Sequence, residues 1–116
     1  MCSVVGYVGN SWCREIVLDG LSRLEYRGYD SAGFACIDHE HHIRCVKAVG
    51  QLDRLKEKLL QTPIDGPIGI GHTRWATHGA VTELNAHPHL DMQHSLALVH
   101  NGIIENHLSL KKKLID

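Results

Sequence analysis

The first residue with nucleophilic chemistry is Cys2, which directly follows Met1. If Met1 is removed, Cys2 carries a thiol and a free α-amine on one carbon atom. An α-amino group titrates near ~7.7–8.0 and a free thiol near ~8.5, so close to neutral pH the amine can take the thiol proton, directly or through one water. A nucleophile activated in this way needs no histidine. The alternative interpretation is that Cys2 is a small buried hydrophobic residue.

Histidine is the unusual feature of the composition, with 10 residues in 116. Three of them lie in the DHEHH segment at 38–42, between two apolar runs. We interpret this segment as the polar tip of a hairpin rather than as a metal site, because adjacent histidines on a turn rarely converge on one ion. A second group comprises His72, His78, His87 and His89. Zinc sites need fixed spacings and cysteine or carboxylate partners, so we expect hydrogen-bonding roles for these four.

The composition is that of one ordinary globular domain. Hydrophobic residues make up 43% and charged residues 22%, and the formal net charge of -1 gives no general attraction to nucleic acid or to an anionic membrane. No apolar stretch approaches the ~18 residues that span a bilayer, and no secretory signal is visible. The four cysteines show no C-x-x-C pair and no metal spacing. We therefore expect reduced thiols, no metal and a cytoplasmic location.

Hydrophobic periodicity predicts the elements that must position these groups. Residues 3–8 are expected to form a buried strand, followed by a helix from Trp12 to about Tyr26 that Asn10 or Ser11 could cap. Arg27 and Gly28 would stop that helix, with Gly28 in a left-handed conformation.

The middle of the chain predicts a hairpin, a helix and a further strand. Residues 32–38 and 43–49 form the hairpin around the polar tip. Residues 51–61 form an amphipathic helix, with Leu52, Leu55, Leu59 and Leu60 on its apolar side. Residues 68–75 then form a strand that emerges into a loop.

The last third of the chain has a different character. Residues 77–94 show no period, and loops of this length are often lids or binding loops. A strand at 96–102 runs into Asn101-Gly102, which can make a tight turn or direct backbone N–H groups into a cleft. A final helix begins near Ile104, and its apolar side needs something to pack against. This order of elements predicts part of a longer fold, or a chain that a partner completes.

Five segments together carry a resemblance to a known family. They are MCSVVGYVG at the start, LEYRGYDSAG at 24–33, GIGHTRWATHG at 69–79, NAHPH at 85–89 and VHNGIIENH at 99–107. The chain resembles the amino-terminal glutaminase part of glutamine–fructose-6-phosphate aminotransferases (isomerizing), also called glucosamine-6-phosphate synthases. These are class II glutamine amidotransferases of the N-terminal nucleophile hydrolase superfamily. The resemblance implies an α+β fold, an αββα sandwich of mainly antiparallel strands, here incomplete.

The resemblance also implies the roles of the residues that would hydrolyse glutamine. Cys2 would attack the side-chain amide while its own α-amine moves the protons. The side-chain amide of Asn101 and the backbone N–H of Gly102 would form the oxyanion hole; a simple strand-end turn is the alternative there. Arg74 would clamp the α-carboxylate of glutamine, because its planar fork suits a carboxylate.

Other residues would have supporting roles by the same resemblance. Trp75, Thr77 and His78 would lie on a loop that closes over bound glutamine and retains ammonia, although Trp75 could instead be a core anchor. Arg27 and Gly28 would support Cys2 without touching substrate. His87 would brace the loop.

The sequence differs from the family pattern in two respects. The family usually has glycine after the nucleophile, whereas this chain has Ser3, whose Cβ and hydroxyl could disturb the cysteine. In the family the glutaminase domain is roughly twice as long and is followed by sugar isomerase domains that bind fructose 6-phosphate. We therefore expect residues 2–116 to be the N-terminal half of that domain, without the isomerase domains. A homodimer or a split-gene partner could complete it.

Two functions follow from these expectations. The first is a glutaminase that needs no cofactor and serves the synthesis of glucosamine 6-phosphate in a full-length enzyme. The second is an inactive truncated remnant or a fragment that binds a partner. Neither involves nucleic acid or a membrane. A histidine-rich metal-binding module is a third and weaker interpretation.

Overall fold

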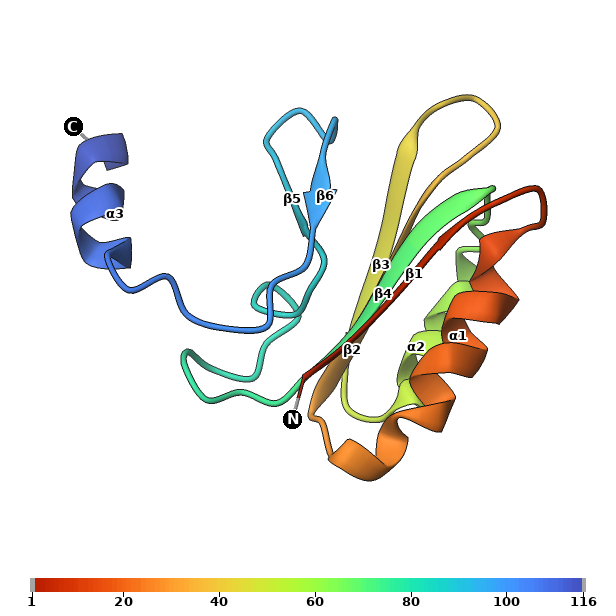
Figure 1. The fold of residues 1–116 in the computed structure, drawn as a ribbon, viewed down its shortest axis with the longest axis horizontal. Helices are drawn as coiled ribbons and strands as arrows, with labels where there is room; N and C mark the ends of the chain where they lie inside the picture. The colour runs from red at the N-terminus through yellow and green to blue at the C-terminus, as the bar shows by residue number, and fades with distance from the viewer. Residues whose placement is uncertain (1, 116) are drawn as a thin grey trace.

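The computed structural model describes residues 2–115, and Met1 and Asp116 lie outside the described part. The helices and strands are β1 (Ser3–Val8), α1 (Cys13–Arg23), the short 3-10 helix η1 (Glu25–Arg27), β2 (Ser31–Ile37), β3 (Ile43–Val49), α2 (Leu52–Gln61), β4 (Ile68–Arg74), β5 (His89–Leu90), β6 (Ala97–Leu98) and α3 (His107–Ile115) (Figure 1). The fold is α+β, as the sequence predicts.

Four strands form one antiparallel sheet in the order β1-β4-β2-β3. The hairpin of β2 and β3 is confirmed, and its tip is organised by Asp38, whose Oδ1 accepts hydrogen bonds from the backbone N–H groups of Glu40 and His42, both at 2.9 Å. The first strand does not pair with its neighbour in sequence but with β4, so Ser3 lies opposite Thr73. This pairing brings the amino terminus to the end of β4.

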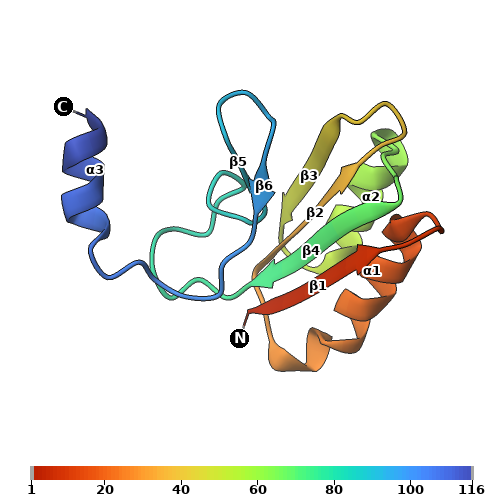
Figure 2. The same cartoon turned by 45° about the horizontal axis from the view of Figure 1, so that its top comes forward.

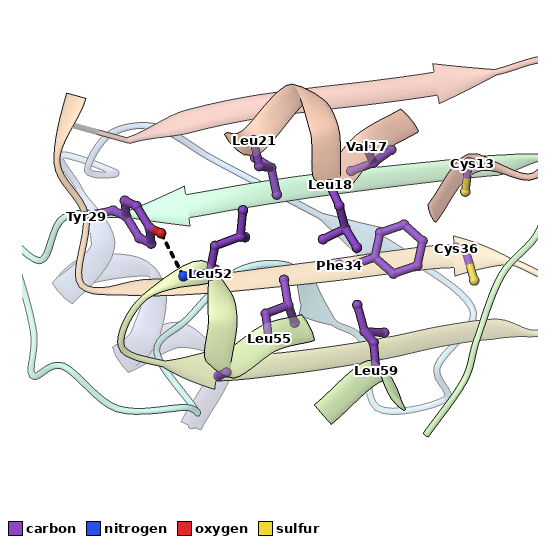
Figure 3. Close-up of a cluster of buried hydrophobic side chains, with 12 residues drawn as sticks. Cys13, Val17, Leu18, Leu21, Tyr29, Phe34, Cys36, Leu52, Leu55 and Leu59 are labelled. Carbon is purple, nitrogen blue, oxygen red and sulfur yellow. Dashed lines mark hydrogen bonds between the residues drawn. The ribbon is translucent and has the colours of Figure 1, made fainter. Parts of the chain in front are cut away.

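Both long helices cover the same face of this sheet (Figures 1 and 2). The apolar side of α1 packs mainly over β1 and β4, and that of α2 mainly over β3. Figure 3 shows that side chains of both helices also surround Phe34 of β2. The buried cluster comprises Cys13, Val17, Leu18, Leu21, Tyr29, Ala32, Phe34, Cys36, Ala48, Leu52, Leu55 and Leu59. In α2, Leu60 is 83% exposed, so its predicted place on the apolar side is wrong. Successive residues of a helix are turned by about 100°, so Leu60 points away from the row that Leu52, Leu55 and Leu59 form against the sheet.

The two helices begin with help from distant residues. Neither Asn10 nor Ser11 caps α1, which corrects the sequence expectation. Instead Asp65 Oδ1 accepts the Arg14 backbone N–H at 2.8 Å. At α2, the phenol oxygen of Tyr29 accepts the N–H of Leu52 at 2.7 Å (Figure 3). These acceptors satisfy amide groups that have no partner within a helix.

The segment that follows β4 lies on the side of the sheet opposite to α1 and α2 (Figure 2). The irregular segment 77–94 is confirmed as mainly loop, with β5 pairing with β6 near its end. The predicted strand at 96–102 is shorter than expected, because only Ala97–Leu98 pairs. The last helix begins at His107 instead of Ile104 and has no buried residue. Its apolar side chains remain exposed, as the sequence indicates for a helix without a packing partner.

Candidate active site

A cleft of about 480 Å³ lies where the ends of β1 and β4 meet the long loop. Its wall includes these residues that the sequence singled out: Cys2, Arg74, Trp75, Thr77, His78, His87 and Gly102. A smaller cavity of about 270 Å³ lies elsewhere, between the sheet and β6, and its wall is apolar, with Ile37, Ile70 and Leu96. We assign the candidate site to the larger cleft, because it combines a thiol, a guanidinium and imidazole rings.

The side chain of Ser3 lies on the face of the sheet opposite to the cleft. Ser3 pairs with Thr73, which pairs in turn with Ala32 of the buried core. Because side chains alternate across a strand, Ser3 points to the helical layer, whereas Arg74 points to the opposite face. Ser3 is 1% exposed, and its Oγ has no hydrogen-bond partner among residues 2–115. The hydroxyl that departs from the family pattern therefore lies away from the cleft that contains Cys2.

Cys2 differs from the other thiols in its surroundings. It is half-buried at the cleft, and its Sγ lies 3.9 Å from the backbone oxygen of Trp75, which accepts the S–H. Burial raises the pKa of Cys13 to about 11 and that of Cys36 to about 12, and it also raises the pKa of Cys45. Since the thiolate is the reactive form, these three thiols stay protonated and inert near neutral pH.

Arg74 connects the strand end to the loop above it. Its Nη1 donates to the oxygen of Ala80 at 3.0 Å, and its Nη2 donates to the oxygen of His78. Gly79 has φ +83°, which turns the backbone so that both carbonyls face the guanidinium. Arg74 is 8% exposed, and no carboxylate within residues 2–115 forms an ion pair with it. Each Nη retains a second N–H, so this buried cation can still bind an anion.

The start of the loop is anchored on both sides of Trp75. Asp30 Oδ2 accepts the backbone N–H of Ala76 at 2.8 Å, and the Asp30 N–H donates to the oxygen of Arg74 at 2.8 Å. Trp75 itself is 50% exposed and lines the cleft. The alternative of a core anchor for Trp75 is therefore wrong.

Histidines connect the sheet to the segment that contains Asn101. His72, on β4, is fully buried, and its Nε2 lies 2.6 Å from Asn101 Oδ1. The ring of His87 stacks on that of His72 at 4.4 Å, and His87 Nδ1 accepts the backbone N–H of His100 at 3.1 Å. Burial lowers the pKa of His72 and lowers that of His87 to about 4. The rings are therefore neutral at physiological pH, with the hydrogen-bonding roles that the sequence predicts.

Two residues that the sequence analysis did not single out hold the loop on the sheet. Gly33 lies beneath the backbone of His87, where a Cβ would come within 1.8 Å of the His87 oxygen. Lys47 Nζ donates to the backbone oxygens of Ala86 at 2.8 Å and Leu84 at 3.3 Å. Gly33 is the last residue of the LEYRGYDSAG motif, so its place in that motif could have indicated a role at the site. Nothing in the sequence pattern pointed to Lys47.

Three of the predicted site residues do not line the cleft. Asn101 lies at its margin, between His100 and Gly102, which are both in the wall. Arg27 belongs to η1, and Gly28 follows it with φ +79°, a positive angle as predicted. The supporting role of Arg27 and Gly28 stays a prediction.

The described residues, 2–115, contain neither a candidate metal-ligand cluster nor a membrane-crossing helix. Their His, Cys, Asp and Glu side chains make no group of three or more that could hold a metal ion. Within the same range, no helix has the length and apolar character needed to cross a membrane.

Comparison with known proteins shows close sequence relatives, although no family model matches the chain. The chain is 54% identical over 114 residues to a glutamine–fructose-6-phosphate aminotransferase (isomerizing) from Idiomarina loihiensis, an alignment that covers 98% of this chain and 18% of that protein. A relative of the same description from Caldanaerobacter subterraneus subsp. tengcongensis is 54% identical over 116 residues, covering 100% of this chain and 19% of that protein. The chain thus spans about a fifth of the length of the curated relatives that it matches.

Solved structures show the same fold. A glutamine phosphoribosylpyrophosphate amidotransferase from B. subtilis, complexed with ADP and GMP, matches with a TM-score of 0.80 and 29% identity, covering 99% of this chain and 25% of that chain. A structure described as the allosteric regulatory enzyme of purine biosynthesis matches with a TM-score of 0.81 and 30% identity over the same shares.

The fold and these likenesses define the class of protein: part of a glutamine amidotransferase domain of the N-terminal nucleophile hydrolase type. This confirms the fold class that the sequence predicts. Within this class, the chain belongs to the glutamine–fructose-6-phosphate aminotransferase family and matches its N-terminal part.

Proposed function

We propose that the cleft hydrolyses the side-chain amide of glutamine to glutamate and ammonia, with Cys2 as the nucleophile. The observation that carries this proposal is the meeting of a half-buried thiol and a buried guanidinium in one cleft, although Cys2 and Arg74 are far apart in sequence. A thiol suits attack on an amide carbon, and a guanidinium suits the α-carboxylate of an amino acid.

The covalent chemistry proceeds in two steps. After removal of Met1, the α-amine of Cys2 takes the thiol proton, and Sγ attacks the amide carbon of glutamine. The carbon–nitrogen bond then breaks, and the amide nitrogen leaves as ammonia with the proton that the α-amine returns. Water hydrolyses the thioester and releases glutamate and the free thiol. No metal or organic cofactor is needed for this sequence of steps.

Arg74 supports the assignment of an amino-acid substrate. Its charge is almost fully buried, and its hydrogen-bond partners in the structure are the neutral carbonyls of His78 and Ala80. A buried charge is costly unless it is paired. A substrate carboxylate would supply the missing negative charge through the N–H groups that remain free on the two Nη atoms.

The oxyanion of the tetrahedral intermediate would form beside Asn101 and Gly102. Gly102 lies in the wall of the cleft, and Asn101 lies at its margin. We assign the oxyanion hole to the Asn101 side-chain amide and the Gly102 backbone N–H. Trp75, Thr77 and His78 lie on the loop over the cleft and would exclude water around bound glutamine.

In a full-length relative the ammonia would pass to fructose 6-phosphate and form glucosamine 6-phosphate. We propose that residues 2–116 are the N-terminal half of the glutaminase domain in such a protein, with a homodimer or a second chain completing the fold. The exposed apolar side of α3 is consistent with such packing, since Leu108 is 72% and Leu114 87% exposed. The cytoplasm would be the site of this chemistry.

Labelling with a glutamine-mimicking diazo-ketone tests the proposal. We expect one adduct on Cys2 after loss of Met1, no adduct on Cys13, Cys36 or Cys45, and protection by added glutamine. Peptide mapping by mass spectrometry locates the adduct. Glutamate and ammonia should form in equal amounts from glutamine.

Matched variants separate the site from general thiol chemistry. Cys2→Ala should abolish glutamine hydrolysis, whereas Cys45→Ala should retain it, because Cys45 is half-buried outside the cleft. Hydrolysis that survives in Cys2→Ala, or labelling of Cys2 that glutamine does not reduce, would refute the proposal. Those outcomes would favour the inactive remnant or partner-binding fragment, which the exposed surface of α3 also fits.

A further inference from the structure

The side chain of Asn101 is hydrogen-bonded to a residue of the four-stranded sheet. Its Oδ1 lies 2.6 Å from Nε2 of His72, which is fully buried on β4. Asn101 itself is exposed and belongs to no helix or strand. The hydrogen bond therefore connects a surface loop to a strand of the four-stranded sheet.

The geometry determines where the proton of His72 lies. A carbonyl oxygen can only accept a hydrogen bond, so Nε2 must carry the hydrogen in the contact with Asn101. The other ring nitrogen, Nδ1, is buried and has no hydrogen-bond partner among residues 2–115. In an imidazolium, Nδ1 would be a buried donor without an acceptor, which is costly. His72 is therefore the neutral ring with its proton on Nε2.

The surroundings of His72 maintain the neutral form. Its strand neighbours across the sheet, Val4 and Gly33, carry no charge. Burial is the main cause that lowers the pKa of His72; the hydrogen bond with Asn101 opposes it, and the nearby His89 and Arg74 lower the pKa as well. The stacked ring of His87 is neutral too, since its Nδ1 accepts the N–H of His100. These surroundings favour the neutral ring over the imidazolium, and the contact of Nε2 with Asn101 Oδ1 selects the tautomer.

We propose that His72 is a positioning residue that fixes the amide of Asn101, so that its oxygen faces the sheet and its N–H₂ group faces the cleft. This inference rests on the proposed glutaminase function. If the amide were rotated by 180°, Asn101 would present a carbonyl oxygen to the developing oxyanion and would repel it. A hydrogen bond from a buried, neutral imidazole excludes that rotation.

His72 acts through Asn101 and does not contact substrate. Its ring is fully buried and it is not part of the cleft wall. Neither nitrogen is therefore available as a general base. This arrangement predicts an effect on the chemical step, while glutamine binding through Arg74 is retained.

The test compares two substitutions of His72. His72→Gln places an amide N–H close to the position of Nε2, whereas His72→Leu fills the space without a donor. We expect His72→Leu to lower kcat for glutamine hydrolysis by roughly 10²–10³-fold, as for loss of one oxyanion donor, with KM changed less than about threefold. His72→Gln should recover at least about tenfold of the lost kcat. Equal loss in both variants, or wild-type kcat in His72→Leu, would overturn the inference.

A double-mutant comparison separates positioning from general stability. If His72 works only through Asn101, the His72→Leu/Asn101→Ala double variant should have the same kcat as Asn101→Ala alone, within about twofold. Independent, multiplicative losses would overturn the inference. Thermal unfolding of each variant identifies one that fails to fold, and in that case the spectroscopic test below decides.

A spectroscopic readout keeps the inference separate from the proposed function. In the ¹⁵N NMR spectrum of the wild-type chain, His72 should show a protonated Nε2 and an unprotonated Nδ1 at pH 7. In Asn101→Ala, the Nε2–H proton should exchange faster with water. An Nδ1–H tautomer or an imidazolium would overturn the inference, even if the protein hydrolyses glutamine. Conversely, a protein that lacks glutaminase activity can still show this tautomer, in which case only the proposed function fails.

Discussion

Substitution of Gly33 by alanine is expected to displace the loop that carries His87. A Cβ at Gly33 would lie 1.8 Å from the His87 backbone oxygen, 2.8 Å from its carbon and 2.9 Å from Cδ of Pro88. Non-bonded heavy atoms attract near ~3.5 Å, so the loop must move by about 1.5 Å or more. Backbone atoms are in the way, and no flexible side chain can swing aside.

This displacement has consequences for stability and for the site. Overpacking of this kind costs about 1–3 kcal/mol, which corresponds to a fall in unfolding temperature of about 4–12 °C for a domain of this size. The movement would also break the contact of His87 with the ring of His72 and with the N–H of His100. Because errors of 1 Å near a reacting centre cost about 10²-fold in rate, we expect Cys2 labelling and glutamine hydrolysis to fall by about that factor.

Gly6→Ala is the matched control. Gly6 lies on β1 of the same sheet and on the same face as Gly33, but its Cβ would meet Ile70 at 3.9 Å, an ordinary contact. Its unfolding temperature should be unchanged or slightly higher, as measured by calorimetry or circular dichroism. If Gly33→Ala unfolds at the wild-type temperature and is labelled at the wild-type rate, the close approach of the loop to β2 is refuted.

Two further predictions concern stability. Ser3→Ala should raise the free energy of unfolding by about 1 kcal/mol in urea titrations, because it removes a buried hydroxyl without a partner; a loss of stability would show that Ser3 Oγ is satisfied. The free energy of unfolding should fall as the pH drops from about 6.5 to about 4. Histidine in the unfolded chain gains a proton near pH ~6.5, whereas burial lowers the pKa of folded His87 to about 4, so acid favours the unfolded state in this window. A His87→Gln variant should show a weaker dependence in that window, and an equal dependence would contradict the assignment.

The sequence by itself determined the local elements and the family. Apolar runs and helical spacing predicted β1, α1, the β2–β3 hairpin, α2 and β4 with small shifts at their ends. The prediction that residues 3–8 form a buried strand is wrong, because β1 is an edge strand on which Val4 and Val8 are exposed. The five motif segments indicated the amidotransferase class and most of the residues that line the cleft. These features depend on neighbours along the chain, which the sequence contains directly.

Only the tertiary structure decided the contacts between distant segments. Three hydrogen bonds illustrate this. They join Asp65 to Arg14 at the start of α1, Lys47 to Ala86 in the loop, and His72 to Asn101, which are 51, 39 and 29 positions apart. The sequence suggested that the side chain of Ser3 could disturb Cys2. Pairing with Thr73 instead directs the Ser3 side chain into the helical layer. Periodicity reports which side of an element is apolar, whereas the sheet order β1-β4-β2-β3 decides which residues meet across that side.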